Sequence, residues 1–95
     1  MKKIYSISYD LNKSGKDYDG LIAAIKSYGT WCTPTKSYWL VATTGSANDI
    51  YNKLKPHLDD DDTIFIQRIM GDRAGWMSKK VWEWVNKHVP STVTV

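Results

Sequence analysis

The chain has 95 residues and a net charge of +3, with thirteen Lys and Arg against ten Asp and Glu. This length fits one small domain, a size at which burial is incomplete and a second subunit often covers remaining apolar surface. Five Trp and six Tyr supply large side chains for a core. The single Cys32 excludes an internal disulfide framework. Because no membrane-spanning apolar run and no secretory leader is present, we expect a cytoplasmic protein without a membrane partner.

Residues 2–12 predict the first β-strand, because apolar and polar side chains alternate along them. One face of this strand is apolar and is expected to contact the core: Tyr5, Ile7, Tyr9 and Leu11. The other face is mostly polar: Ile4, Ser6, Ser8 and Asp10. The carboxylate of Asp10 is therefore placed where the strand ends.

A helix and two more strands are predicted next. The helix follows a loop at residues 12–16 and has Asp17 as its candidate cap. Residues 30–33 and 36–43 are rich in β-branched and aromatic residues, so they predict two antiparallel strands. We expect a bend at Pro34 between them, and a proline indicates an edge strand.

The second half of the chain predicts a helix, a strand and a third helix. Ser46 with Asp49 is spaced as a capping box at the start of the second helix, and Pro56 is expected to end or kink this helix. The acidic run at residues 59–62 is expected to be a solvated linker, and the apolar residues 63–70 predict the last strand. The third helix is expected over residues 78–88, with Ser78 as its cap. The final five residues alternate like a strand at a terminus, so the sequence leaves their order open.

The predicted order of elements is strand, helix, strand, strand, helix, strand, with an appended C-terminal helix. This is the α+β, ferredoxin-like βαββαβ plan, in which a four-stranded antiparallel sheet has two helices on one face. We expect a single domain over residues 1–95, with its core at about residues 3–70. The opposite face of the sheet is expected to be open. Its Ser6, Ser8 and Asp10 indicate contact with a partner or ligand.

Two segments, YSISYDLN and KSYWLV, carry a resemblance to a known family. They resemble the CRISPR-associated protein 2 family and its relatives, including the virulence-associated protein D toxins, and look closest to a branch of small bacterial and phage proteins. Tyr9 and Asp10 match the hydrophobic strand that ends in Tyr-Asp. Ser37 begins the matching segment of Ser, apolar and aromatic residues. The resemblance covers about residues 3–70 and implies a ferredoxin-like homodimer.

The resemblance also implies a catalytic metal site at Asp10. The equivalent aspartates of two subunits would face each other and hold Mg²⁺ or Mn²⁺, which would activate water against RNA or DNA. Family members place arginines after the Tyr-Asp motif, whereas this chain has Lys13 and Lys16. These lysines and Ser37 are candidate phosphate contacts. A turn or cap role for Asp10 also stays open, because aspartate is common where a strand ends.

A second constellation is QRIMGDRAGWMSKK, which gathers four cations around an aromatic residue. Arg68, Arg73, Lys79 and Lys80 surround Trp76, a mixture that suits phosphates and unstacked bases. Both lysines fall in the first turn of the predicted third helix, where the helix dipole disfavours cations unless an anion binds there. The alternative is that Trp76 packs this helix against the sheet while the lysines are solvated.

Two functions remain open on the sequence alone. The first is a nucleic-acid-binding homodimer that also acts as a metal-dependent endonuclease or phosphodiesterase. The second is a non-catalytic dimeric module that binds a nucleotide or a protein, as a phage or defence-system accessory would. His57, His88 and Cys32 lack metal-ligand spacing, so they are not candidates for a metal site.

Overall fold

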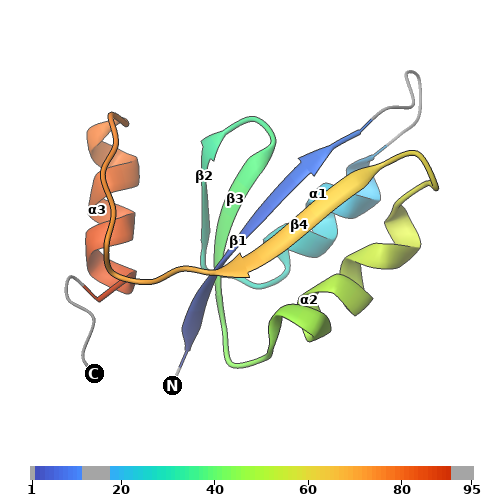
Figure 1. The fold of residues 1–95 in the computed structure, drawn as a ribbon, viewed down its shortest axis with the longest axis horizontal. Coiled ribbons are helices and arrows are strands. Elements are labelled where there is room, and N and C mark those ends of the chain that lie inside the picture. The colour runs from blue at the N-terminus through green and yellow to red at the C-terminus, as the bar shows by residue number, and fades with distance from the viewer. Residues whose placement is uncertain (1, 12–17, 91–95) are drawn as a thin grey trace.

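The computed structural model describes residues 2–11 and 18–90, which form an α+β domain (Figure 1). Its elements follow in the order β1 (Lys3–Asp10), α1 (Asp19–Lys26), β2 (Trp31–Thr35), β3 (Tyr38–Thr43), α2 (Ala47–Leu54), the short 3-10 helix η1 (Lys55–His57), β4 (Thr63–Arg68) and α3 (Lys79–His88). This order confirms the predicted ferredoxin-like plan with an extra C-terminal helix. Among the described helices, none is both long and apolar enough to cross a membrane.

The described strands form one antiparallel sheet in the order β2-β3-β1-β4. The central strand β1 pairs with β3 on one side and β4 on the other. Ile7 of β1 lies opposite Trp39 and Ile66, so these three side chains share one face. Residues one position away, such as Ser8 and Phe65, share the other face. The edges of the sheet are therefore β2 and β4.

Helices α1 and α2 cover the face that carries the apolar side chains of β1 (Figure 1). The buried residues of this core are Tyr5, Ile7, Tyr9, Leu21, Ile25, Trp39, Val41, Ile50 and Leu54. The indole N–H of Trp39 donates a hydrogen bond of 3.0 Å to the Tyr9 hydroxyl, so two large aromatic residues are buried without an unpaired donor on the indole. The predicted core face of the first strand is confirmed.

The start and the end of α2 follow the local sequence as predicted. The Ser46 hydroxyl accepts the backbone N–H of Asp49 at 3.1 Å, and the Asp49 carboxylate accepts the N–H of Ser46 at 2.9 Å. This reciprocal pair satisfies two N–H groups that have no partner inside the helix. The helix ends at Leu54, two residues before Pro56, and the chain tightens into η1. The proposed cap of the first helix, Asp17, lies outside the described residues, as do residues 91–95.

The expectation that the second face of the sheet is open is wrong for the half that α3 covers. Figure 1 shows α3 on the side of the sheet away from α1 and α2. A second apolar cluster lies under it and contains Ile4, Leu40, Ala42, Val85 and Val89. The apolar residues of β1 and β3 on this face need a cover, and the amphipathic α3 provides it.

The polar residues of β1 on this second face divide into a buried and an exposed part. Ser6 is only 4% exposed, and its hydroxyl donates to the Gln67 carbonyl oxygen at 3.3 Å. Ser8 and Asp10 are exposed. Only the part of the face near the end of β1 therefore remains accessible.

The edge strand β2 differs from the prediction in one detail. Pro34 lies inside β2 and not in a bend, and the chain turns at Lys36 and Ser37. The pairing of β2 with β3 shifts register between Cys32 and Thr35, which accommodates the proline. The predicted position of this strand at the edge of the sheet is confirmed.

The contact of α3 with the sheet is expected to contribute to global stability. Val85→Ala removes a buried side chain from the second cluster and should lower the free energy of unfolding by about 1–3 kcal/mol. Lys87→Ala, on the exposed side of the same helix, should change it by less than about 0.5 kcal/mol. Denaturant unfolding measures both. Equal effects of the two variants would show that α3 is not packed on the sheet.

Candidate functional site

The segment between β4 and α3 carries the most exposed large aromatic side chain among the described residues. It runs from the end of β4 along α3 to the first turn of that helix (Figure 1). Trp76 in this segment is 100% exposed. The alternative that Trp76 packs the third helix against the sheet is therefore wrong. Met77 and Trp82 pack against the second cluster instead, and Trp82 also lies close to Gly75.

Arg73 is held by acceptors of the protein itself. Its guanidinium donates to the carbonyl oxygens of Gly71 at 2.9 Å and Pro90 at 3.0 Å, and to Asn86 Oδ1 at 2.9 Å. These bonds tie the segment after β4 to α3 and the residues that follow it. Arg73 was predicted as a phosphate contact. The structure gives it a positioning role, and its charge faces acceptors that a phosphate would have to displace.

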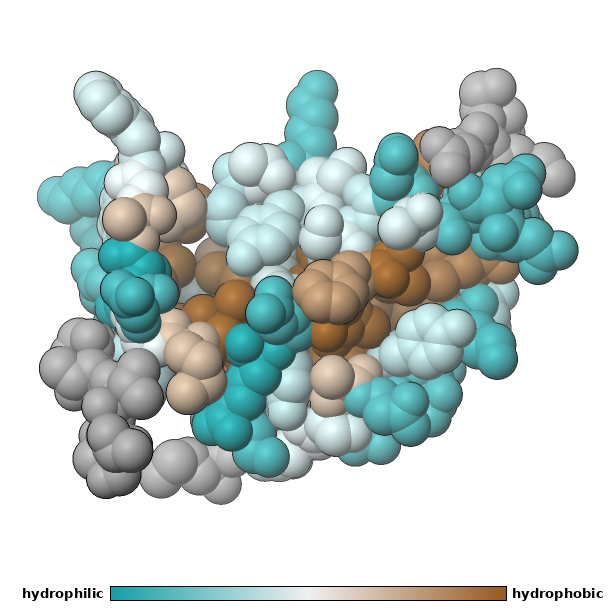
Figure 2. All heavy atoms as spheres, in the orientation of Figure 1, coloured by the Kyte–Doolittle hydropathy of each residue, from teal (hydrophilic) through white to brown (hydrophobic). Residues whose placement is uncertain are grey.

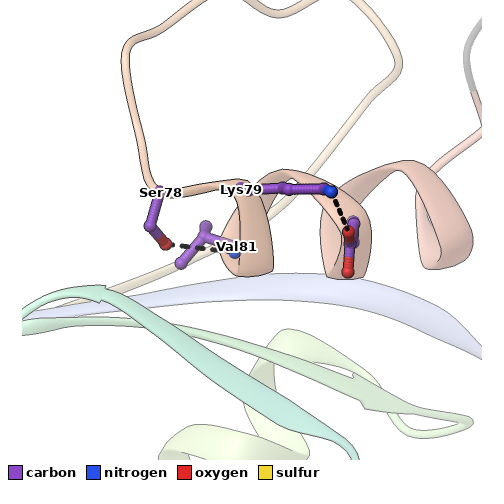
Figure 3. A network of polar contacts seen from close by, with 4 residues as sticks. Ser78, Lys79 and Val81 are labelled. Carbon is purple, nitrogen blue, oxygen red and sulfur yellow. Dashed lines mark hydrogen bonds and ion pairs between the residues drawn. The ribbon is translucent and has the colours of Figure 1, made fainter.

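The first turn of α3 presents two lysines beside the exposed tryptophan. The Ser78 hydroxyl caps the helix by accepting the N–H of Val81 at 3.3 Å, as predicted, and Figure 3 shows this contact beside Lys79. Lys79 Nζ lies 3.9 Å from Glu83 Oε1, and both side chains are largely exposed. A pair of this kind contributes little and is readily exchanged for another anion.

Two hollows border α3. One, with a volume of about 300 Å³, lies between α3 and the edge strand β2, and Lys80 is one of its lining residues. The other, of about 430 Å³, lies between α3, the segment after β4 and the sheet. Arg68 and Tyr38 line this second hollow together with Met70 and Trp82. Of the predicted constellation, Arg68 and Arg73 line the second hollow and Lys80 lines the first, whereas Trp76 and Lys79 line neither.

Asp10 lies at the other end of the sheet from this constellation. It is exposed and pairs with Thr63 at the start of β4, whereas Arg68 at the end of β4 pairs with Tyr5. Five residues separate the two positions along the strands, which corresponds to about 17 Å. Ser37 lies near the Asp10 end, because its carbonyl oxygen accepts the N–H of Tyr9 at 3.1 Å.

The described residues of one chain do not assemble a metal site at Asp10. Among them, no group of three or more His, Cys, Asp or Glu side chains could hold an ion together. A cation at Asp10 would therefore need a carboxylate from a second chain, as the resemblance implies. Lys13 and Lys16, the predicted phosphate contacts beside Asp10, lie outside the described residues.

The acidic run at residues 59–62 is more than the solvated linker that the sequence predicts. The Asp62 carboxylate accepts the Tyr18 hydroxyl at 2.9 and 3.1 Å through its two oxygens, and it also accepts the N–H of Asp59 at 2.8 Å. Asp62 therefore fixes the turn before β4 to the start of α1. This contact joins residues far apart in the sequence, so the local pattern could not reveal it.

Burial raises the pKa of the Cys32 thiol to about 11. The thiol is therefore protonated at neutral pH, when only a thiolate would be nucleophilic. This agrees with the omission of Cys32 from the candidate residues.

Phe65 is a feature that the sequence reasoning missed. The apolar run at residues 63–70 predicts a buried strand, but β4 is an edge strand and Phe65 is 60% exposed. The signal was present in the alternation of TIFIQR, which puts Phe65 on the same face as Thr63 and Gln67. This side chain is therefore exposed beside the edge of the sheet.

Comparisons with known proteins add no relative: no family model, no curated protein and no solved structure matches the chain.

The positioning role of Arg73 can be tested by a conservative change. Arg73→Lys keeps the charge but cannot reach three acceptors at once, so the free energy of unfolding should fall by about 1 kcal/mol. Arg68→Lys serves as the matched control and should change it by less than about 0.5 kcal/mol. Thermal or denaturant unfolding measures both. No difference between the variants would remove the positioning role.

Proposed function

We propose that the protein binds single-stranded nucleic acid through Trp76 and the cations around it. The observation that carries this proposal is the complete exposure of the Trp76 side chain. A tryptophan offers a large apolar face, and leaving that face in water forgoes the stabilisation that burial would give. An unstacked base is a suitable partner, because every base has a π-face that can stack on the indole.

The charge around Trp76 supports the same proposal. Residues 63–95 carry five Lys and Arg against two Asp and Glu. Arg68, Lys79 and Lys80 are exposed, and the Glu83 contact of Lys79 is weak enough to be replaced by a phosphate. The combination of backbone-neutralising cations with a stacking residue is typical of proteins that bind single strands without strong sequence preference.

The alternative, a module that binds a nucleotide or a protein, uses the same surface. A mononucleotide engages one stacking residue and few cations, whereas a longer strand extends from Trp76 toward Arg68 along the groove beside α3. The two ligands therefore differ in how affinity depends on length. An affinity that rises from mononucleotide to oligonucleotide favours the proposed function.

Substitution of Trp76 tests the proposal directly. Trp76→Ala should weaken binding of a labelled oligo-dT or oligo-U strand by about tenfold or more, because stacking on one aromatic residue contributes about 1–3 kcal/mol. Fluorescence anisotropy measures the affinity. Unfolding should be unchanged, since Trp76 is fully exposed. Trp76→Phe should retain most of the affinity.

Controls for this experiment come from the same chain. Asn52→Ala changes an exposed side chain of α2 that does not line the two hollows beside α3, and it should leave binding unaffected. Lys79→Ala and Lys80→Ala should each reduce the slope of log affinity against log salt by about 0.7, if each lysine neutralises one phosphate of a single strand. Equal binding by wild type and Trp76→Ala, or no binding by either, would contradict the proposed function.

Metal-dependent cleavage at Asp10 is a separate proposal that rests on the resemblance. Mg²⁺ or Mn²⁺ shared by two Asp10 carboxylates would lower the pKa of a bound water. Asp10→Asn should then abolish cleavage of single-stranded RNA or DNA, while Trp76-dependent binding is retained because Asp10 and Arg68 lie at opposite ends of the β1–β4 ladder, about 17 Å apart, and the segment with Trp76 follows from the Arg68 end. Electrophoresis of labelled strands with either metal, and with EDTA as control, measures this. Equal cleavage by the wild type and the variant would exclude the role of Asp10.

A further inference from the structure

We infer that β4 is a self-association surface, at which the β4 strands of two copies pair antiparallel about a two-fold axis at Phe65. This inference does not depend on the proposed function. It concerns the edge of the sheet, whereas nucleic acid is proposed to bind at Trp76 and the first turn of α3, and the two surfaces share only Arg68 at the end of β4. The occupant of the edge is a second copy of this chain.

The two edges of the described sheet are unequally protected. The β2 edge contains Pro34 and has a register shift between Cys32 and Thr35. These features hinder pairing with a further strand. The β4 edge pairs with β1 without a register shift and contains neither proline nor lysine. A regular edge of this kind is a template for another strand.

Apolar side chains remain accessible along β4: Phe65 is exposed, and Ile64 and Ile66 are half-buried. Figure 2 shows a hydrophobic band that follows β4 where this strand faces the viewer. Beside the strand, a hollow of about 240 Å³ is lined by Ile64, Phe65, Ile66 and three residues of α2, including Tyr51. The exposure of Phe65 and of this hollow is accounted for if a second copy covers them.

The phase of the backbone hydrogen bonds restricts how a second β4 can pair. The N–H of Ile69 donates to the Ile4 carbonyl oxygen at 2.9 Å, in register with the β1–β4 ladder. Bonded pairs alternate along an antiparallel ladder, so Thr63, Phe65 and Gln67 direct their backbone groups to β1. The backbone groups of the alternate residues point outward from the sheet: Ile64, Ile66 and Arg68. A second strand must bond to these groups.

One alignment matches these outward groups and also matches the side chains. When the axis passes through Phe65, Ile64 lies opposite the partner's Ile66 and Arg68 lies opposite the partner's Asp62. An axis at Ile64 would instead place Ile66 against the partner's Asp62. An axis at Ile66 would place Arg68 against the partner's Ile64. Only the Phe65 alignment pairs apolar with apolar residues and brings the Arg68 charge opposite the partner's Asp62, whose carboxylate also keeps its hydrogen bonds from Tyr18 and Asp59 of its own chain.

The alignment accounts for the exposure of Phe65 in a single chain. Phe65 would lie directly opposite the partner's Phe65 in a pair without backbone hydrogen bonds, where side chains approach most closely. Aromatic pairs across strands stabilise such contacts. The carboxylate-rich turn before β4 would meet the cationic end of the partner's β4, which fixes the antiparallel direction.

The same dimer separates the two Asp10 residues. Three strand spacings of about 4.8 Å and four residue rises of about 3.4 Å place their Cα atoms on the order of 20 Å apart. Two carboxylates at this separation cannot share one ion. The β4 dimer and the shared metal site at Asp10 therefore exclude each other. Cysteine crosslinking at Phe65 distinguishes them.

Cysteine crosslinking tests both the surface and its alignment. In a Cys32→Ser background, Phe65→Cys should form a disulfide-linked dimer with oxidised glutathione, because opposite Cα atoms at about 4.5 Å fall within disulfide range. Thr63→Cys and Gln67→Cys share that face and strand but should not crosslink, since their copies lie on the order of 14 Å apart. Non-reducing electrophoresis measures the linked fraction. The reduced forms of all three variants should show wild-type circular dichroism.

Analytical ultracentrifugation measures the monomer–dimer equilibrium without a crosslink. The wild type should pass from monomer to dimer with rising concentration, and Phe65→Lys should weaken dimerisation by about tenfold or more, because like charges would then lie directly opposite each other. A wild type that remains monomeric would overturn the inference. This holds even if the β4 edge then binds a strand of another protein. Equal crosslinking at the three positions, or a dimer unaffected by Phe65→Lys, would overturn it as well.

Discussion

The packing of α3 on the second face of the sheet is the contact on which the rest of the structure depends. Val85 and Val89 cover Ile4, Leu40 and Ala42, while α1 and α2 cover the other face. Helix α3 covers only part of the second face, so Ser8, Asp10 and Phe65 remain exposed on the rest of it. Partners can therefore contact this uncovered part, the edges of the sheet, or the segment that leads to α3. Trp76 lies in that segment and is fully exposed.

The antiparallel ladder then separates these surfaces. Asp10 and Ser37 lie at one end of the sheet, and Arg68 with the segment that carries Trp76 follows from the other end. Pairing of two β4 strands would join both copies into one continuous sheet and leave each Trp76 outside the interface. Such a dimer has two stacking residues on one assembly. A strand long enough to reach both would bind more tightly than to a monomer, because its second contact is intramolecular.

Much of the fold follows from local sequence patterns. Alternation in β1, the capping box at Ser46 and the cap at Ser78 predicted their elements correctly, because each depends on residues close in the chain. The cover of the second face, the turn contact of Asp62 and the hydrogen bonds of Arg73 were not predicted. Each joins segments distant in the sequence, and the patterns of the single segments do not encode which others they meet. The sequence did not decide between a binding role for Trp76 and its packing against the sheet, because tryptophan is often buried and the local pattern does not show what α3 contacts.

The most direct test is hydrogen exchange of the β4 amides at different protein concentrations. It shows whether two copies of the chain pair through the β4 edge. The N–H groups of Ile64, Ile66 and Arg68 point outward, while those of Phe65 and Gln67 bond to β1. We expect protection of the first three to rise with concentration as dimers form, and protection of the other two to change much less. Outward amides that exchange rapidly at every concentration would contradict the account.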